Sequence, residues 1–152
     1  MMDGNKSIKK IIIWGAKYQF KVIRPILISQ GFKIELLIDQ TPNLKKYLGY
    51  DVVNSLEDFK KWRKNKNVKD ELGFIICISN PNGKIREKKA KELINLGLKP
   101  ISIISKSARI AEDVVLGDGL QILENVVIHP GSKIGDYCIF LSNSLIDHDC
   151  VI

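Results

Sequence analysis

The sequence predicts an α/β unit with a small parallel sheet of Rossmann type, followed by a left-handed parallel β-helix. Three observations support this prediction. Strand-like and helix-like segments alternate over the first hundred residues, large apolar residues recur every six positions in the last third, and the net charge changes sign between the two parts. We therefore expect two domains, over residues 1–101 and 102–152.

The 152 residues have a net charge of +7 that is unevenly distributed. Residues 1–100 contain 21 Lys and Arg against 10 Asp and Glu, whereas residues 101–152 contain 3 against 7. The lysines lie in runs such as 60–64 and 84–91, which a helix would expose. A solvated helix face therefore explains them better than a nucleic-acid partner. Attraction of a small anionic ligand stays open.

The sequence contains none of the patterns typical of membrane-spanning helices, a secretory signal or metal-ligand spacing. No stretch approaches the roughly 18 apolar residues that a membrane helix needs, and the N-terminus lacks the pattern of a secretory signal. Cys77, Cys138 and Cys150 have no metal-ligand spacing. We therefore expect a cytoplasmic protein with reduced thiols, no metal site and no membrane partner.

The N-terminal unit is expected to contain four strands, at residues 8–14, 33–38, 73–78 and 99–103. The first helix should end before Gly31, and Pro25 should delay its start. Ser55 is a candidate N-cap for a second helix, whose apolar face would hold Leu56, Phe59 and Trp62. A third helix is expected over residues 82–96, with three inward residues: Ile85, Leu93 and Ile94.

The last third shows a period of six. A helix repeats every 3.6 residues and a strand every two, so neither produces this pattern. It suits a triangular coil in which each side is one hexapeptide and both a large and a smaller residue point inward. The large residues are Ile104, Ile110, Leu116, Ile122, Ile128, Ile134, Phe140, Ile146 and Ile152. The smaller ones are Ala108, Val114, Leu120, Val126, Ser132, Cys138, Ser144 and Cys150.

Three hexapeptides make one coil, so residues 104–152 form somewhat under three coils. The sequence stops on Ile152, an inward position, without a closing loop or helix. Solenoids need terminal caps. We therefore expect this β-helix to be incomplete.

Small and polar residues follow the strands of the N-terminal unit. Gly15 and Ala16 follow the first strand, Asp39 ends the second, and Asn80 follows the third. Ligands of parallel sheets bind at this edge. An acidic residue 24 positions after Gly15 suits a ribose hydroxyl. An ordinary strand-to-turn ending explains Asp39 equally well.

Together these segments resemble the sugar O- and N-acetyltransferases of the NeuD/PglD type. The matching segments are residues 11–16, 36–39, 49–53, 82–86 and, most specifically, the Ile-Asp-His-Asp-Cys-Val-Ile of residues 146–152. The resemblance implies a Rossmann-like domain that binds a nucleotide sugar, and a homotrimer assembled through the β-helix. It also implies transfer of an acetyl group from acetyl-CoA to a free or nucleotide-linked sugar.

His148 is the general base that the resemblance implies. The repeat supports an outward position, because Ile146 points inward and His148 then falls on a turn. A neutral imidazole accepts the proton of an attacking hydroxyl or amine. Asp149 or Asp147 could orient the ring, and the resemblance favours Asp149. His129 matches no catalytic position, so we interpret it as structural.

The sequence departs from the family at the first turn, where Tyr18 and Phe20 replace glycines that allow a close approach of phosphate. Tyr18 would then stack on a base while Lys17 or Lys21 meets phosphate, or no nucleotide binds; both readings stay open. The residues that are candidates for binding a nucleotide sugar are Gly15, Ala16, Lys17, Tyr18, Lys21, Asp39, Asn80 and Arg86.

Three other functions compete with acetyl transfer. A non-catalytic sugar-nucleotide-binding module is favoured by the altered loop, and a purely structural trimerisation role stays open. An NAD-dependent dehydrogenase is disfavoured because the G-x-G-x-x-G fingerprint is absent. The family's later coils, which hold most of the CoA cleft, are missing here, so we expect these 152 residues to be poorly active or inactive.

Overall fold

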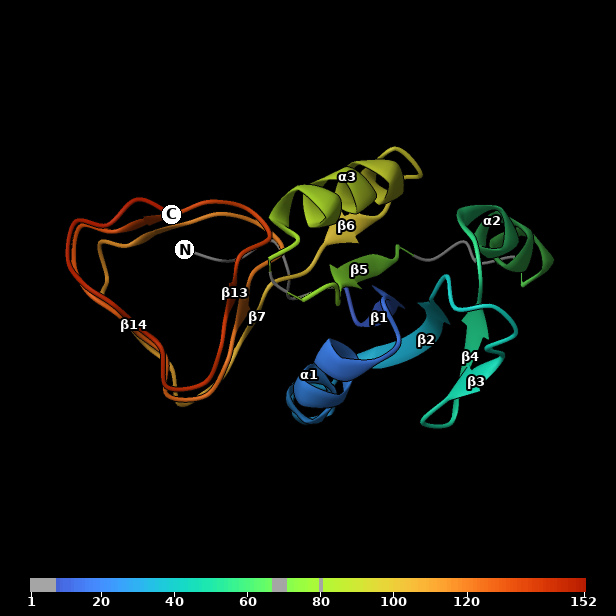
Figure 1. Cartoon of the computed structure of the whole chain (residues 1–152), viewed down its shortest axis with the longest axis horizontal. Coiled ribbons are helices and arrows are strands. Elements are labelled where there is room, and N and C mark those ends of the chain that lie inside the picture. Colours follow the sequence, from blue (N-terminus) through green and yellow to red (C-terminus); the bar gives the residue numbers. More distant parts are fainter. Residues whose placement is uncertain (1–7, 67–70, 80) are drawn as a thin grey trace.

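The computed structural model describes residues 8–66, 71–79 and 81–152. A sheet flanked by helices lies beside a coil of triangular outline (Figure 1). The sheet order is β3-β4-β2-β1-β5-β6, and β3 is antiparallel to β4 while the other pairs are parallel. The strands span Lys10–Trp14 (β1), Lys33–Ile38 (β2), Lys46–Tyr47 (β3), Tyr50–Val53 (β4), Gly73–Ile76 (β5) and Lys99–Pro100 (β6).

In the described part of the chain, three helices cover this sheet: α1 (Tyr18–Ser29), α2 (Leu56–Asn65) and α3 (Gly83–Ile94). Successive residues of β1 point to opposite faces. Ile11 and Ile13 pack in a core that includes Phe20 of α1. Ile12 and Trp14 belong to the other core, with residues of α2 and α3. The central strands are therefore apolar throughout because both faces are covered.

The predicted cap of α2 is confirmed, since Ser55 Oγ accepts the Asp58 amide at 3.0 Å. The predicted delay of α1 is wrong. The helix begins at Tyr18 and contains Pro25. Pro25 is exposed, and buried residues before and after it, including Ile23 and Leu27, hold the helix against the sheet. Tertiary packing thus outweighs the local cost of the proline.

The inward face of α3 also differs from prediction. Ile85 and Ile94 are 47% and 43% exposed, whereas Leu93 is fully buried as expected. Ala90 and Arg86 take the remaining inward positions. The prediction of the inward face from apolar residues alone was wrong because Arg86, a charged residue, is buried at an inward position of α3. The short β3 and β4 strands were not predicted.

The coil is a parallel β-helix in which paired residues are 18 positions apart, as in Gln121 with Ile139. One side holds β7 (Ile103–Ile104), β10 (Gln121–Ile122) and β13 (Ile139–Phe140). The second holds β8 (Arg109–Ile110), β11 (Val127–Ile128) and β14 (Leu145–Ile146). The third holds β9 (Val115–Leu116) and β12 (Lys133–Ile134), and Val151 bridges to Lys133.

The period of six is confirmed by what fills this coil. Every predicted large residue from Ile104 to Ile146 packs in its core, whereas Ile152 is half exposed. Ser132, at one of the smaller inward positions, is fully buried. Cys77 is buried, Cys138 and Cys150 are half-buried, and all three thiols are free.

Buried side chains join the coil to the sheet. Gln121 donates its Nε2–H to the Ile76 carbonyl at 2.7 Å and accepts a hydrogen bond from Gln19 at 2.8 Å. Arg86 of α3 donates to the carbonyl oxygens of Tyr137 and Ile78. The end of β5 and the coil therefore share one hydrogen-bonded interface. None of the helices among the described residues has the length and apolar character that crossing a membrane requires.

Candidate functional site

The turn after β14 holds His148 on the outside of the coil. Ile146 points into the coil core, and the chain then turns through residues 147–150 before Val151 pairs with Lys133. The His148 side chain is 69% exposed, as the repeat predicted. Asp149 has a φ of 56°, a left-handed conformation that Asp tolerates better than most residues.

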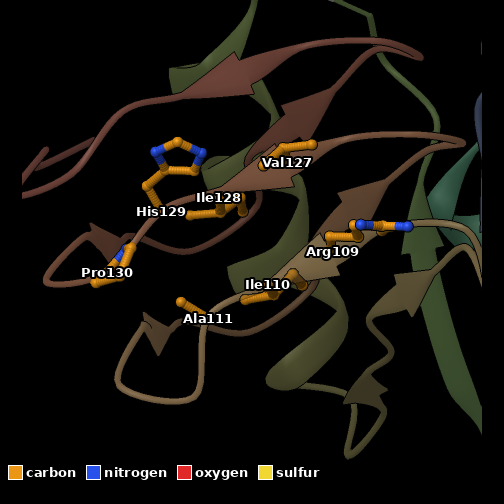
Figure 2. Close-up of a pocket in the computed structure, with 8 residues that line it drawn as sticks. Arg109, Ile110, Ala111, Val127, Ile128, His129 and Pro130 are labelled. Atoms are coloured by element: carbon orange, nitrogen blue, oxygen red, sulfur yellow. The ribbon is translucent and has the colours of Figure 1, made fainter.

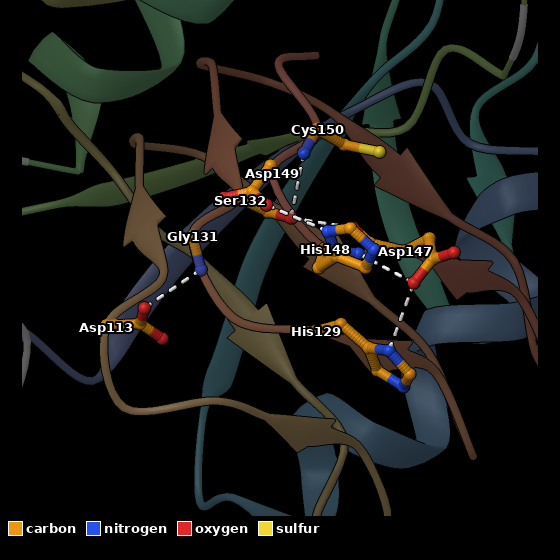
Figure 3. Close-up of polar contacts among 8 residues, drawn as sticks. All are labelled: Asp113, His129, Gly131, Ser132, Asp147, His148, Asp149 and Cys150. Carbon is orange, nitrogen blue, oxygen red and sulfur yellow. Dashed lines mark hydrogen bonds and ion pairs between the residues drawn. The ribbon is translucent and has the colours of Figure 1, made fainter.

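His148 and Asp149 form a hydrogen-bonded pair. Nδ1 of His148 lies 2.8 Å from Oδ2 of Asp149 (Figure 3). This hydrogen bond, together with the negative charges of Asp147 and Asp149, raises the pKa of His148 above its ordinary value. When the imidazole is neutral, a proton on Nδ1 faces the carboxylate and leaves the Nε2 lone pair available. The pair thus has the arrangement of a base and the carboxylate that orients it.

Asp147 holds the same turn differently. Its Oδ1 accepts the backbone N–H of His148 at 2.8 Å and lies 3.3 Å from Nδ1 of His129 (Figure 3). The His148 amide lowers the pKa of Asp147, and the two imidazoles lower it further. His129, interpreted from sequence as structural, therefore belongs to the cluster around His148. Counting one coil of 18 residues from Asp147 would have found it.

The preceding coil supports this turn from below. Ser132 Oγ donates to the Asp147 carbonyl at 2.8 Å and accepts the Cys150 amide at 3.3 Å, so it joins both ends of the turn. The Asp149 amide donates to the Pro130 carbonyl at 2.9 Å. Backbone and side-chain contacts with the coil below thus fix where His148 stands.

A groove of about 470 Å³ lies over β8 and β11. Figure 2 shows His129 and Pro130 along one part of it and Arg109 at another. The remaining lining residues are Ala108, Ile110, Ala111, Val127 and Ile128. Because Pro130 contacts Asp149 through its carbonyl, the groove lies directly under the turn of His148.

At the edge of the sheet, the structure brings Ala16 and Asp39 together. Asp39 Oδ2 accepts the Ala16 amide at 2.8 Å, and Oδ1 accepts the Thr41 amide at 2.9 Å. Partial burial raises the pKa of Asp39, but hydrogen bonds from Thr41 and Ala16 outweigh it and the net direction is downward. Asp39 thus links the turns after β1 and β2.

The backbone conformation and close packing at position 15 require a glycine. Its φ is +100°, and a Cβ there would lie 2.6 Å from the Cys77 carbonyl oxygen. Lys17, Tyr18 and Lys21 follow on the surface, and Tyr18 is 81% exposed. Lys21 Nζ lies 5.9 Å from the centre of the Tyr47 ring.

Arg86 and Asn80, the remaining candidates for binding a nucleotide sugar, do not follow the first turn. Arg86 is 5% exposed and its guanidinium is occupied by two carbonyl oxygens. Burial lowers its pKa, although a guanidinium stays charged. Asn80 lies outside the described residues. The described residues contain no group of three His, Cys, Asp or Glu side chains placed to hold a metal ion.

Residues 113–148 match the family described as bacterial transferase hexapeptide (six repeats). The coil is a hexapeptide-repeat β-helix. Solved structures extend the likeness of this hexapeptide-repeat chain to its N-terminal unit, because they cover nearly all of it. PerB from Caulobacter crescentus, in complex with CoA and GDP-perosamine, is 25% identical with a TM-score of 0.78. The match covers 95% of this chain and 66% of PerB, so this chain spans just under two thirds of the PerB length.

Two further structures share the fold. The acetyltransferase domain of PglB from Neisseria gonorrhoeae, in complex with acetyl coenzyme A, is 20% identical with a TM-score of 0.75, covering 95% of this chain and 67% of that one. WeeI from Acinetobacter baumannii is 25% identical with a TM-score of 0.78, covering 93% and 65%. The solved structures that this chain resembles thus include a protein in complex with CoA and GDP-perosamine, and an acetyltransferase domain in complex with acetyl coenzyme A.

Proposed function

We propose that this chain transfers an acetyl group from acetyl-CoA to a sugar, free or linked to a nucleotide, with His148 as the general base. The observation that supports this most directly is the contact of 2.8 Å between His148 Nδ1 and Asp149 Oδ2 on an exposed turn. The likeness to PerB, which binds CoA and GDP-perosamine, supports the two substrates.

The proposed reaction begins with attack of the acceptor nitrogen or oxygen on the thioester carbonyl carbon. The new C–N or C–O bond forms as the proton of the acceptor passes to Nε2 of His148. Asp149 stabilises the resulting imidazolium through Nδ1–H. The tetrahedral intermediate then loses its C–S bond, and the CoA sulfur takes the proton from Nε2 to leave as the thiol. Atoms and charge balance without a covalent enzyme intermediate.

The sheet edge is the proposed site of the nucleotide. The turns after β1 and β2 lie side by side through Ala16 and Asp39, and Lys17, Tyr18 and Lys21 continue from there onto the surface. A Rossmann-like role of this domain, a left-handed coil, a homotrimer assembled through it and a cytoplasmic location belong to the same proposal. An exposed base suits such a trimer, in which a neighbouring copy would enclose the substrates.

The proposal is tested by adding acetyl-CoA and GDP-perosamine to the chain and detecting the CoA thiol released. Saturable release by these 152 residues would overturn the poor activity expected from the sequence, and His148→Ala should lower that release at least a hundredfold because the base is lost. Lys106→Ala, an exposed substitution in the first coil, is the matched control and should leave the rate unchanged. Unchanged thiol release in His148→Ala would refute the role of this residue.

A non-catalytic binding module is the second candidate. It is favoured by the first turn, where α1 begins at Tyr18 and Phe20 is fully buried, so no glycine-rich loop surrounds a phosphate. Calorimetric titration with GDP-perosamine, UDP-sugars and CMP-sugars separates the two. Saturable binding without thiol release supports the module, whereas binding with release supports the transferase.

A further inference from the structure

We propose that His129 and Asp147 form a positioning pair that fixes the backbone of His148. This inference rests on the proposed function, because it assigns the pair to the base of that reaction. Neither side chain is offered as a catalytic residue. Both act through the turn that presents the imidazole.

One carboxylate oxygen of Asp147 contacts both His148 and His129. Asp147 Oδ1 accepts the backbone N–H of His148 at 2.8 Å and lies 3.3 Å from Nδ1 of His129. The amide contact is local to the turn, whereas His129 belongs to the coil below. The imidazole therefore limits the rotation of the carboxylate and ties the turn to a neighbouring coil (Figure 3).

The backbone of Asp147 is also held by the coil below. The Asp147 carbonyl oxygen accepts a hydrogen bond from Ser132 Oγ, and Ser132 is fully buried in the coil. Asp147 is thus attached to the coil below twice, inside the coil through its carbonyl oxygen and outside through its carboxylate. The outer attachment is the weaker one, because the His129 side chain is 45% exposed and that of Asp147 is 68% exposed.

The two aspartates that flank His148 have separate tasks. Asp149 contacts the ring, and Asp147 contacts the amide. Asp149 thereby sets the tautomer and rotation of the imidazole, whereas Asp147 sets the position of the Cα atom from which the side chain extends. Small errors in the placement of a base reduce the chemical step far more than substrate binding. Loss of the pair should therefore lower kcat and leave KM unchanged.

Kinetics of three His129 variants test the proposal. An asparagine side chain at this position would place an amide nitrogen where Nδ1 now lies, whereas a glutamine extends its amide further, toward the place of Nε2. We expect His129→Ala and His129→Gln to lower kcat about tenfold with KM within about twofold of wild type, and His129→Asn to restore most of kcat. Equal kcat in wild type and His129→Ala would overturn the proposal.

A double-mutant cycle tests whether His129 acts through Asp147. Once Asp147→Asn has weakened the shared contact, His129→Ala should lower kcat by less than about twofold further. A tenfold further loss in that background would show that His129 acts on its own and would refute the pair.

A third measurement needs no turnover. The exchange of the His148 amide hydrogen with water, followed by NMR, reports the hydrogen bond to Asp147. We expect exchange to become several-fold faster in His129→Ala and to stay near wild type in His129→Asn. Unchanged exchange in both variants contradicts the pair. Absence of thiol release from the wild type, with altered exchange in His129→Ala, would refute the proposed function and leave the pair standing.

Discussion

Gly131 lies directly beneath Asp149, and a Cβ on Gly131 would collide with the Oδ1 atom of that carboxylate. The Gly131 amide donates to Asp113 of the coil below at 2.9 Å, so the glycine is held from the other side as well. The carboxylate that orients His148 therefore stands where it does because the residue 18 positions earlier has no side chain.

We predict that Gly131→Ala displaces Asp149 and lowers acetyl transfer at least tenfold. The substitution also costs about 1–2 kcal/mol of stability, since the φ of Gly131 is +75°. Gly97→Ala is the matched control, because Gly97 has a φ of +79° with nothing within 4 Å of the added atom. Urea unfolding should show similar losses for both, and only Gly131→Ala should lose activity. Full activity in Gly131→Ala would contradict the prediction.

The pH dependence of the reaction should reflect the contacts of His148. Its pKa is raised by the hydrogen bond to Asp149 and by the nearby negative charges. The base acts only when neutral, so kcat/KM should rise with pH and level off above this raised pKa. Asp149→Asn removes the carboxylate, which lowers the pKa of His148 and moves the rise to lower pH. The plateau should fall about tenfold or more, because the imidazolium loses its partner.

Measurement of kcat/KM from about pH 5 to pH 9 checks this prediction. A rise that stays at the same pH in Asp149→Asn would show that another group controls the profile. His148→Gln serves as the background, because it lacks the imidazole of the proposed base and should show no such rise.

Gln121 should be the most sensitive polar residue at the junction of the coil and the sheet. Gln121→Leu leaves the Ile76 carbonyl and the Gln19 amide without their partners in a buried interface. Each of the two unsatisfied groups costs about 1–3 kcal/mol, so we expect urea unfolding to show a loss of about 2–6 kcal/mol. The double variant Gln19→Leu with Gln121→Leu should lose less than the sum of the two single variants. Strict additivity would mean that the two amides do not interact.

The variant Arg86→Met distinguishes a substrate-binding role of this arginine from a purely structural one. Its guanidinium binds the Tyr137 and Ile78 carbonyl oxygens, and Arg86→Met removes both hydrogen bonds. Because bonds to charged groups contribute about 1.5–3 kcal/mol each, we expect the loss of two bonds to lower stability by about 3–6 kcal/mol. If the arginine serves packing alone, calorimetry on the folded variant should give the same affinity for GDP-perosamine as wild type. A much weaker affinity would restore Arg86 as a ligand.

The coil was predictable because its pattern depends on a single repeating rule. Every sixth residue must fill the same narrow core, and the large residues from Ile104 to Ile146 do so. The outward place of His148 followed from the same rule. His129 was missed because its contact with Asp147 joins two successive coils. A period of six reveals which residues point inward, but only a comparison of residues 18 positions apart reveals which ones stack in neighbouring coils.

The N-terminal unit was predictable in outline and less so in detail. Runs such as Lys33–Ile38 are apolar enough to indicate buried strands, and Ser55 has the chemistry of a cap. Pro25 misled because local propensity ignores the packing on both sides of it. Ile85 and Ile94 misled because the face of α3 is set by Arg86, whose partners include a carbonyl oxygen of the coil. Contacts between distant segments leave no periodic signal in either segment.

The stacking of residues 18 positions apart gives the coil a fixed increment of height. Neighbouring strands of a sheet are about 4.8 Å apart, so each whole coil between Ile104 and His148 raises the base by that step above the first coil. Insertion or removal of 18 residues would return His148 to the same edge at a different level, whereas a change of six would move it to another side. The distance from the sheet edge to His148 is therefore adjustable only in discrete units. Under the proposed function, an acceptor that reaches from one site to the other would be selected by its length.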